Sequence, residues 1–465
     1  MAENSMTEGL TKASIEERRS VLHETVAELY STGDKRGLRL ILNSQHPADL
    51  ADLMHQYDDD DDEQQQLFEC LAESVAAGVL SELDIPTMLG VAEYIGAEQL
   101  SELVGEMAPD DAADVLGELS QEESETVLGL MDREEADEVR ELLTHEEDTG
   151  GGIMTSRLLT VREDLSVDRA INYLREWAVE DQVFNIYALD AEGRLSGVVS
   201  LRSLILAQPD APISAITQRD PIAVAADMDQ EGIADLFRDY DLVALPVVDD
   251  DGHLIGEVTV DDIVAVIDEE ATEDMYVMAA TSSEEREERS TFGVVRRRIP
   301  WLLVCLAGTL MAGAMIDAFQ ESLSSLTALL FFMPAIMAMG GNAGIQTSTV
   351  TIRNLATGEL QKGAVLKSIV REMRIALMMG SALGLLAFAV SQLWTGNWIV
   401  ASCVGLAMVS AVVFSAFLGA LVPIVFRGMG VDPAVASGPL ITTLNDGISL
   451  GIYFTIASVL LANWG

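Results

Sequence analysis

The sequence lacks the residue groupings on which most enzyme chemistry depends. Its three cysteines, Cys70, Cys305 and Cys403, have no metal-ligand spacing, and its five histidines are isolated from one another. No CxxC, HExxH, P-loop or Gly-x-Ser-x-Gly arrangement is present, so neither ATP hydrolysis nor a hydrolase triad has support. We therefore expect no enzyme. Scattered cysteines are typical of small apolar core residues in a reducing compartment.

Positive charge is also scarce. The chain has 27 Lys and Arg against 76 Asp and Glu, which gives a net charge of −49. Residues 1–298 hold 70 of the acids and 21 of the basic residues, whereas residues 299–465 hold six of each. The chain thus divides into an acidic part and a neutral part. Because self-repulsion of this size disfavours compact folding at low salt, we expect a salt-loving source.

The neutral part contains long stretches without any formal charge. They cover residues 299–316, 322–352 and 375–426. A membrane-spanning helix needs roughly 20 apolar residues. The pattern therefore predicts five spanning helices, with the longest stretch folded as a hairpin. We expect its break near residues 392–398, where Trp394 and Trp398 suit a membrane interface.

Basic residues indicate the orientation. They precede the first predicted span at 296–298, lie between the second and third spans at 353–374, and follow the fourth at Arg427. With five spans, all three groups fall on one side, which the positive-inside rule makes cytoplasmic. We therefore expect a multi-pass protein of the cell membrane, with its acidic part in the cytoplasm and its C-terminus outside. The first 40 residues lack an apolar core, so we expect no signal peptide.

Asp446 is the only formal charge in the 33 residues 433–465, which are apolar enough to cross a bilayer. A carboxylate at membrane depth is costly and is by default functional. No basic residue in its own helix can pair with it, so its natural partner is a permeating cation. The alternative is a protonated side chain that hydrogen-bonds the neighbouring Thr442, Thr443 or Asn445.

Two kinds of repeat organise the acidic part. Residues 15–145 have apolar positions at helical spacing, and the phrase at 46–54 recurs at 107–116, which predicts a superhelical stack of short helices. Further on, residues 185–201 align with 244–260 at an offset of 59. Each copy predicts a strand, an Asp/Gly turn, a second strand and a helix.

The second repeat resembles a pair of CBS domains, a regulatory module that often binds adenine nucleotides. Thr259 and Asp262 match the end of the element that contacts the ribose in that family, whereas the first copy lacks the acid. The alternative role for Asp262 is a helix N-cap. Residues 268–280 contain neither Gly nor Pro and predict a helix leading toward the first span.

Taken over its full length, the chain resembles the MgtE magnesium transporters. The resemblance implies a multidomain membrane protein made of an α-helical superhelical N-domain, an α/β CBS-domain pair, a long connecting plug helix and an all-α domain of five spans. The corresponding residues are 1–148, 149–208 and 209–268, 269–298, and 299–465. The motifs that carry it lie at residues 46–49, 148–155, 270–274, 298–302, 340–348, 353–359, 432–439 and 442–446.

Members of this family are homodimers that conduct Mg²⁺ inward and close when cytosolic Mg²⁺ binds between their acidic domains. The resemblance therefore implies Mg²⁺, a second copy of the chain, the lipid bilayer, and ATP or another adenine nucleotide at the CBS pair as partners, and no nucleic acid. One alternative is a CBS-regulated transporter of Co²⁺ or Mn²⁺, or an exporter. Another is a membrane-anchored nucleotide sensor, against which Asp446 argues.

The pore and sensor residues follow from the same resemblance. Mg²⁺ retains several of its waters, so its pore needs few direct ligands. We expect irregular backbone at 340–344 to line the path, with close helix packing as the alternative. The expected pore residues are Asp446, Asn342, Gly341, Ala343, Thr442 and Asn445. The expected sensor ligands are Asp110 and Asp114, which share a helix face, with Asp262, Glu270, Glu273, Asp274 and Asp432; the alternative for each is a solvated surface charge.

Overall fold

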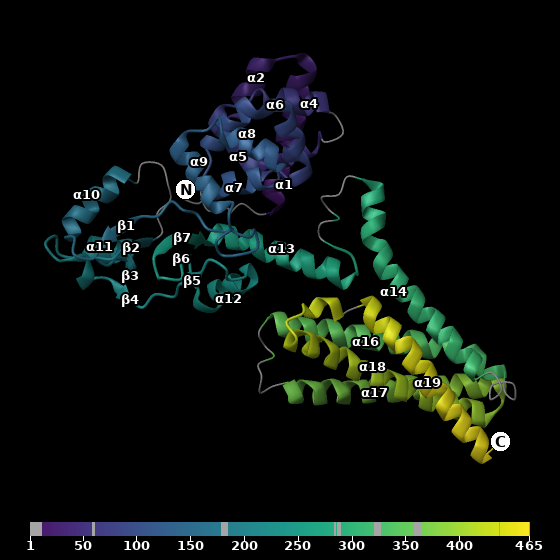
Figure 1. The fold of residues 1–465 in the computed structure, drawn as a ribbon. Helices are drawn as coiled ribbons and strands as arrows, with labels where there is room; N and C mark the ends of the chain where they lie inside the picture. The colour runs from purple at the N-terminus through teal and green to yellow at the C-terminus, as the bar shows by residue number, and fades with distance from the viewer. Residues whose placement is uncertain are drawn as a thin grey trace, which may run out of the picture. The chain divides into compact units, whose positions relative to one another are not determined.

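The structure, a computed structural model, describes residues 12–57, 61–177, 185–282, 285, 290–319, 327–357, 360, 365–436 and 438–464 (Figure 1). The chain folds as two compact units, Met1–Asp268 and Glu269–Gly465. The first unit contains stacked helices and two small sheets, and the second is helical in its described residues.

The stacked helices begin the first unit. Several pack on the next but one along the chain, as α3 does on α5, α5 on α7, and α7 on α9. This arrangement is the predicted superhelical stack. The helices are α1 (Lys12–Thr32), α2 (Lys35–Leu42), α3 (Pro47–His55), α4 (Asp61–Phe68), α5 (Glu73–Glu82), α6 (Ile85–Gly105), α7 (Pro109–Gly117), α8 (Gln121–Leu128) and α9 (Arg133–Leu142).

The recurring sequence phrase begins two equivalent helices of this stack. Pro47 opens α3 and Pro109 opens α7, a position where the fixed φ of proline favours the helix and its missing N–H costs nothing. Apolar residues at spacings of three and four then bury one face of each helix. The acids between them stay at or near the surface, which places carboxylates along the stack.

The CBS pair forms two sheets of the same plan. In the first, β1 (Thr160–Arg162) is parallel to β2 (Asn185–Leu189), which is followed by the antiparallel β3 (Leu195–Ser200) and β4 (Gln218–Arg219). In the second, β5 (Val224–Ala225) is parallel to β6 (Ala244–Val248), and β7 (Leu254–Thr259) is antiparallel to β6. Strands β2 and β3 correspond to β6 and β7 at the predicted offset. The helices of the pair are α10 (Val167–Trp177), α11 (Leu201–Leu206), η1 (Ile213–Ala215) and α12 (Gln230–Tyr240).

The two copies share their irregularities and contact each other. Both hairpins shift register before their turn, and both turns use a glycine at positive φ, Gly193 at 87° and Gly252 at 84°. Between the copies, the buried Tyr187 hydroxyl donates a hydrogen bond to Oε2 of the buried Glu257 at 2.5 Å. Thr155, in the segment entering the pair, exchanges two backbone hydrogen bonds with Glu257.

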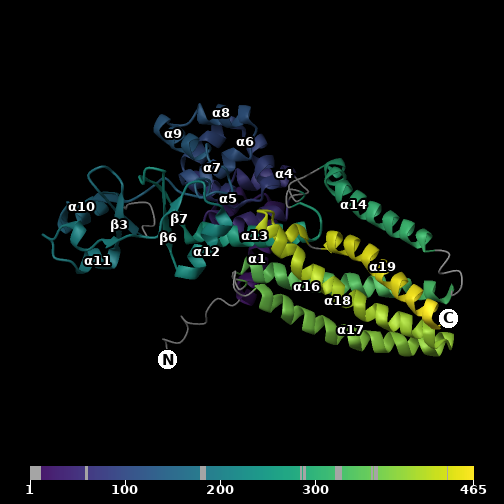
Figure 2. The same cartoon turned by 60° about the horizontal axis from the view of Figure 1, so that its bottom comes forward.

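The second unit contains five helices long and apolar enough to cross a membrane, as predicted. Helices α16 to α19 lie side by side in both views, and α14 packs against α19 (Figure 2). The predicted hairpin break is confirmed by Gly396 at a φ of 64° and by Asn397, which caps α18. The elements are α14 (Thr291–Ala318), η3 (Thr327–Phe332), α16 (Met333–Ala356), α17 (Val365–Thr395), α18 (Trp398–Gly428), η4 (Pro433–Ala436) and α19 (Gly438–Trp464).

The predicted plug helix over 269–298 differs from the structure. Helix α13 (Val260–Met278) begins directly after β7, inside the second CBS copy, and ends before Ala280, which has a φ of 59°. Helix α14 begins at Thr291 and already includes the last residues of the predicted range. The helix predicted from the absence of Gly and Pro at 268–280 is largely present as the second half of α13, whereas the longer plug helix implied by the resemblance is interrupted, because the left-handed turn at Ala280 ends α13.

Candidate cation sites

Four carboxylates of the first unit form a group at the meeting of α7 and α13. Asp110, Asp111 and Asp114 lie on α7, and Asp262 lies in the first turn of α13. Each of Asp111 and Asp114 is close enough to Asp110 and Asp262 for mutual repulsion. The structure therefore brings together the predicted Asp110, Asp114 and Asp262, and adds Asp111.

The environment of this group favours protonation or a bound cation. Burial by surrounding protein, followed by repulsion from neighbouring carboxylates, raises the pKa of Asp111 and Asp114 to about 7. Burial also raises the pKa of Asp262 to about 6, and it raises the pKa of Asp110. Asp111 and Asp114 remain exposed to water whereas Asp110 and Asp262 are half-buried. A hydrated cation can thus reach the group from solvent.

Asp110 ties this group to the CBS pair. It accepts a hydrogen bond from the Thr155 side chain, whose backbone is paired with β7. Its Oδ1 atom is buried and accepts no hydrogen bond from the part of the chain that the structure describes. An unpaired buried carboxylate oxygen is costly, and a divalent cation would satisfy it.

A second group of carboxylates lies in the second unit. Burial raises the pKa of Asp274 on α13, and repulsion from Asp432 and Glu273 adds to the shift. Asp432 precedes η4, and its Oδ1 accepts a hydrogen bond from the Ala434 N–H at 2.8 Å. The predicted Asp274, Glu273 and Asp432 are therefore neighbours. Glu270 lies on α13 one turn before Asp274, which places it on the same face.

Two acids of these groups escaped the sequence reasoning. Asp111 and Asp261 each repel members of the first group. Both directly adjoin a predicted ligand, at Asp110 and Asp262. A search for acids at helical spacing of four passes over such neighbours. The signal that could have found them is a pair of adjacent acids in the first turn of each of two helices, α7 and α13.

Asp446 lies in α19 and is half-buried in the single chain. Its polar neighbours are engaged elsewhere. The Thr442 hydroxyl donates to the Gly438 carbonyl of its own helix at 2.8 Å. Asn445 is 1% exposed, donates weakly to the Met337 carbonyl at 3.4 Å and accepts from the Ser449 hydroxyl at 2.9 Å. The structure thus turns Asn445 toward α16 rather than toward an open path.

The expected irregular backbone at residues 340–344 is wrong, because these residues lie in the interior of the continuous helix α16. Their carbonyls belong to the hydrogen-bond ladder of the helix. The glycines serve close packing instead: a Cβ on Gly340 would lie 2.8 Å from Asn445 Nδ2, and one on Gly344 would lie 2.5 Å from Ser415 Oγ. Within this stretch Ala343 is buried and Gly341 faces Thr442, whereas Asn342 is exposed.

The two candidate nucleotide-binding residues, Thr259 and Asp262, are hydrogen-bonded to each other. The Thr259 hydroxyl donates to Asp262 Oδ2 at 2.6 Å, and the Thr259 backbone N–H also bonds this carboxylate. Since α13 begins at Val260, Asp262 is the third residue of the helix and not its N-cap. Together the pair resembles the reciprocal capping arrangement of helix N-termini.

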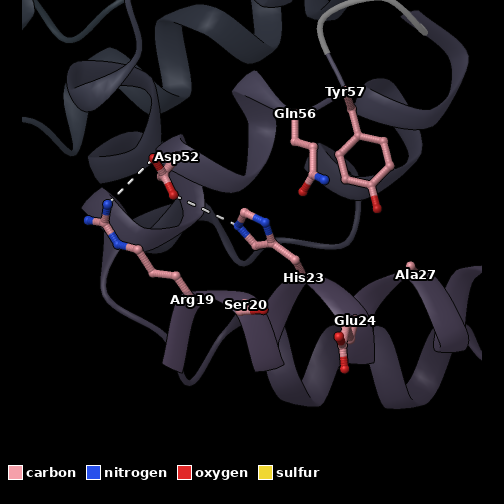
Figure 3. A pocket seen from close by; sticks show the side chains of 8 residues that line it. All are labelled: Arg19, Ser20, His23, Glu24, Ala27, Asp52, Gln56 and Tyr57. Atoms are coloured by element: carbon pink, nitrogen blue, oxygen red, sulfur yellow. Dashed lines mark ion pairs between the residues drawn. The ribbon is translucent and has the colours of Figure 1, made fainter. Parts of the chain in front are cut away.

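Two further sets of carboxylates have partners nearby. Arg19 and His23 of α1 reach toward Asp52 of α3 in an open pocket of about 600 Å³ (Figure 3), and Arg19 also binds Asp49 at 2.8 Å. At the tip of the β6–β7 hairpin, Asp249 accepts backbone hydrogen bonds from Asp251 and His253. In both places opposite charges or backbone donors contact the carboxylates.

Comparison with known proteins identifies the family. Models of the MgtE intracellular N domain, the CBS domain and the MgtE divalent cation transporter match residues 45–148, 150–210 with 213–269, and 333–456. The magnesium transporter MgtE of Bacillus subtilis is 32% identical over 434 residues, which cover 93% of this chain and 96% of that protein. The chain belongs to the MgtE family. The MgtE of Thermus thermophilus is 37% identical over 319 residues, 68% of this chain and 71% of that protein.

A solved MgtE structure matches the soluble part. The cytosolic domain of the Mg²⁺ channel MgtE in complex with ATP has 35% sequence identity and a TM-score of 0.50, and the match covers 52% of this chain and 99% of that one. With its five apolar helices, this MgtE chain is a multi-pass membrane protein. The MgtE relatives are named as transporters and not as enzymes.

Proposed function

We propose that the protein is a Mg²⁺-selective channel that admits Mg²⁺ to the cell down its electrochemical gradient and is closed by cytosolic Mg²⁺ bound to its acidic groups. The observation that carries the proposal is Asp446, the single formal charge of α19, placed in the first third of a membrane-spanning helix. A carboxylate at this depth needs a partner, and a passing cation supplies one.

Asp446 suits an ion that keeps its water. Mg²⁺ dehydrates reluctantly and is commonly held through one or two carboxylates. In a twofold dimer, Asp446 is present twice about one axis. The charge of the pair attracts a divalent ion, and water molecules of the hydration shell can bond nearby side-chain oxygens, for which Asn342 and Thr442 are our candidates. Gly341 and Ala343 leave space beside these candidates, because glycine has no side chain and alanine has only a methyl group.

The membrane potential is a sufficient source of energy. Two charges moving through an inside-negative potential gain about 2 × 2.3 kcal/mol per 100 mV. Uptake therefore requires no ATP hydrolysis. The orientation expected from the basic residues places the acidic unit in the cytoplasm, where it can sense the imported ion.

Closure follows from the two carboxylate groups. The members of each group repel one another, as the raised pKa values of Asp111 and Asp114 in the first and of Asp274 in the second indicate. Mg²⁺ bound among them removes this repulsion and favours whichever arrangement holds them closest. By linkage, the ion shifts the gate only as far as it prefers that arrangement. Asp110, Glu270, Glu273, Asp274 and Asp432 complete the proposed ligands.

An adenine nucleotide is the proposed second ligand of the CBS pair. The support is the ATP named for the related cytosolic domain. In this chain Thr259 and Asp262 would contact the ribose only after giving up part of their mutual hydrogen bond. The nucleotide and the cation would then compete for Asp262, since the same carboxylate belongs to the first acidic group.

Uptake into proteoliposomes tests the channel. The full chain is reconstituted, both sides are held nearly free of Mg²⁺, and an inside-negative potential is imposed before external Mg²⁺ is added. We expect native protein to take up Mg²⁺, and Asp446→Ala to lose at least about 100-fold of the rate, a cost of about 2.7 kcal/mol or more. Asp317→Ala, which removes an exposed carboxylate at the end of α14, is the matched control and should retain uptake.

The same assay separates the alternatives. Competition by Co²⁺ or Mn²⁺ at concentrations equal to Mg²⁺ would favour a less selective transporter, and transport only against the imposed direction would favour an exporter. No movement of any divalent ion by native protein would leave a membrane-anchored sensor. Equal uptake by native protein and Asp446→Ala would keep transport but overturn the role of Asp446.

A further inference from the structure

The first half of α17 carries three basic residues on one face. Lys367, Arg371 and Arg374 follow one another at spacings of four and three, so their side chains form a stripe about 10 Å long on the helix axis. All three are exposed. None has an ion-pair or hydrogen-bond partner among the described residues. By contrast, Arg298 at the start of α14 is paired with Glu285.

The opposite face of α17 is the one that packs on the bundle. Glu372, Ala376, Gly380 and Gly384 are buried there. A Cβ on Gly384 would lie 2.8 Å from the carbonyl oxygen of Gly405 in α18, so the two helices are in close contact. The basic stripe therefore points away from α18. Packing within the chain does not explain why three cations gather on this face.

The same face becomes apolar further along the helix. Met378 is 75% exposed and Leu385 is 71% exposed, at positions that continue the stripe. Leu366, Val370 and Ile375 flank the basic residues and are exposed as well. These three residues, the three basic residues and Met378 line an open groove of about 500 Å³. A ligand that fits this surface has an anionic end and a long apolar end.

We propose that this face of α17 binds an anionic phospholipid. Its phosphate headgroup lies on Lys367, Arg371 and Arg374, and its acyl chains lie along Met378 and Leu385. Arginine side chains bind phosphate oxygens through paired hydrogen bonds, and basic pockets on membrane-spanning helices are suited to anionic headgroups. Because the soluble part repels an anionic membrane surface, the stripe supplies local attraction where the rest of the chain has little.

Two simpler roles for this face lead to different behaviour. The three residues could act only through the positive-inside rule, which requires charge near the membrane but no bound lipid. Alternatively, the face could be covered by a second copy of the chain. Neither role requires a preference for anionic over neutral lipid.

Native mass spectrometry of the full chain tests the proposal. The protein is purified in detergent and mixed with equal amounts of phosphatidylglycerol and phosphatidylcholine of the same acyl chains, and bound lipids are counted. We expect native protein to retain phosphatidylglycerol preferentially. The triple variant Lys367→Gln, Arg371→Gln, Arg374→Gln should bind it about 10–100-fold more weakly, as expected for three basic residues at an anionic surface.

A matched variant controls for net charge. Arg133→Gln, Arg169→Gln, Arg202→Gln removes the same charge from exposed positions of the soluble part and should leave lipid retention unchanged. A charge-preserving variant, with Arg371→Lys and Arg374→Lys, should retain most of the binding and shows whether the triple variant fails through misfolding. Displacement of the lipid by inorganic phosphate alone would assign the site to a free anion and overturn the lipid proposal. Equal lipid counts in the native protein and the triple variant, with or without a change in oligomeric state, would also overturn it.

Discussion

The first unit and the last spanning helix of the second unit differ in how they hold carboxylates. The first gathers Asp110, Asp111, Asp114 and Asp262 within range of mutual repulsion, and two of them are exposed to water. The second places a single carboxylate, Asp446, in an otherwise uncharged helix. A group of several carboxylates is expected to give a graded response to cation concentration, because each carboxylate contributes part of the cation binding. If ion passage depends on one intramembrane carboxylate, removal of that carboxylate is expected to abolish passage.

The sharpest way to break this comparison is to remove one carboxylate from each unit. We expect Asp446→Asn to reduce Mg²⁺ uptake by at least about 100-fold. Asp114→Asn should leave the maximal rate unchanged, since its neighbours remain. Both variants are measured in the same proteoliposomes at low cytoplasmic-side Mg²⁺. A comparable loss of maximal rate in Asp114→Asn would end the distinction between pore and sensor.

A second prediction concerns the close packing of the spanning helices. A Cβ on Gly419 would overlap the carbonyl oxygen of Gly344, whereas a Cβ on Gly313 would meet nothing within 4 Å. Gly419→Ala should therefore destabilise the bundle by about 1–3 kcal/mol. Gly313→Ala should be neutral or slightly stabilising, because alanine favours the helix. Thermal unfolding of the two variants in detergent measures the difference, and similar melting temperatures would contradict the close helix contact.

A third prediction sharpens the graded response. Asp111→Asn with Asp114→Asn should raise the Mg²⁺ concentration that half-protects the soluble part from proteolysis, by roughly 5–10-fold. The reason is that two of the repelling ligands are gone. Without Mg²⁺ the same variant should resist proteolysis better than native protein. Asp210→Asn, at an exposed position outside the group, is the control. An unchanged Mg²⁺ requirement would remove α7 from the sensor.

The smallest expected effect is the pH dependence. In the folded state Asp111 and Asp114 have a pKa of about 7 and Asp262 of about 6, all above the ordinary value of 3.8. Between pH 4 and 7 the folded state therefore binds more protons than the unfolded chain, so stability falls as pH rises and levels off above pH 7. Because Asp111 and Asp114 are exposed and water screens their repulsion, we expect the melting temperature without Mg²⁺ to fall by only roughly 2–4 °C between pH 5 and 8. Saturating Mg²⁺ should flatten the profile, and a rising profile would contradict the clustering.

The sequence predicted those features that periodicity encodes directly. The offset of 59 between the CBS copies reappears in the strands β2, β3, β6 and β7, and the uncharged runs became the five spanning helices. Charge scarcity in the second half was informative because a bilayer excludes charge over a fixed length.

What the sequence could not give depends on contacts between distant residues. The stretch at 340–344 suggested an irregular path, yet its glycines meet Asn445 and Ser415, which lie 71 or more residues away along the chain. The sequence likewise predicted Asn445 as an ion-binding residue, but in the structure its side chain contacts α16. The sequence shows that a residue is small or polar, but only the fold shows which distant residue contacts it.

The Tyr187–Glu257 hydrogen bond makes the contact between the two CBS copies asymmetric. At the repeat offset, Tyr187 corresponds to Pro246 and Glu257 corresponds to Val198, so neither partner has an equivalent in the other copy. A duplicated module could in principle pair with the same half of another chain and exchange domains. Because the first copy supplies the tyrosine and the second copy supplies the glutamate, this hydrogen bond forms only between a first copy and a second copy.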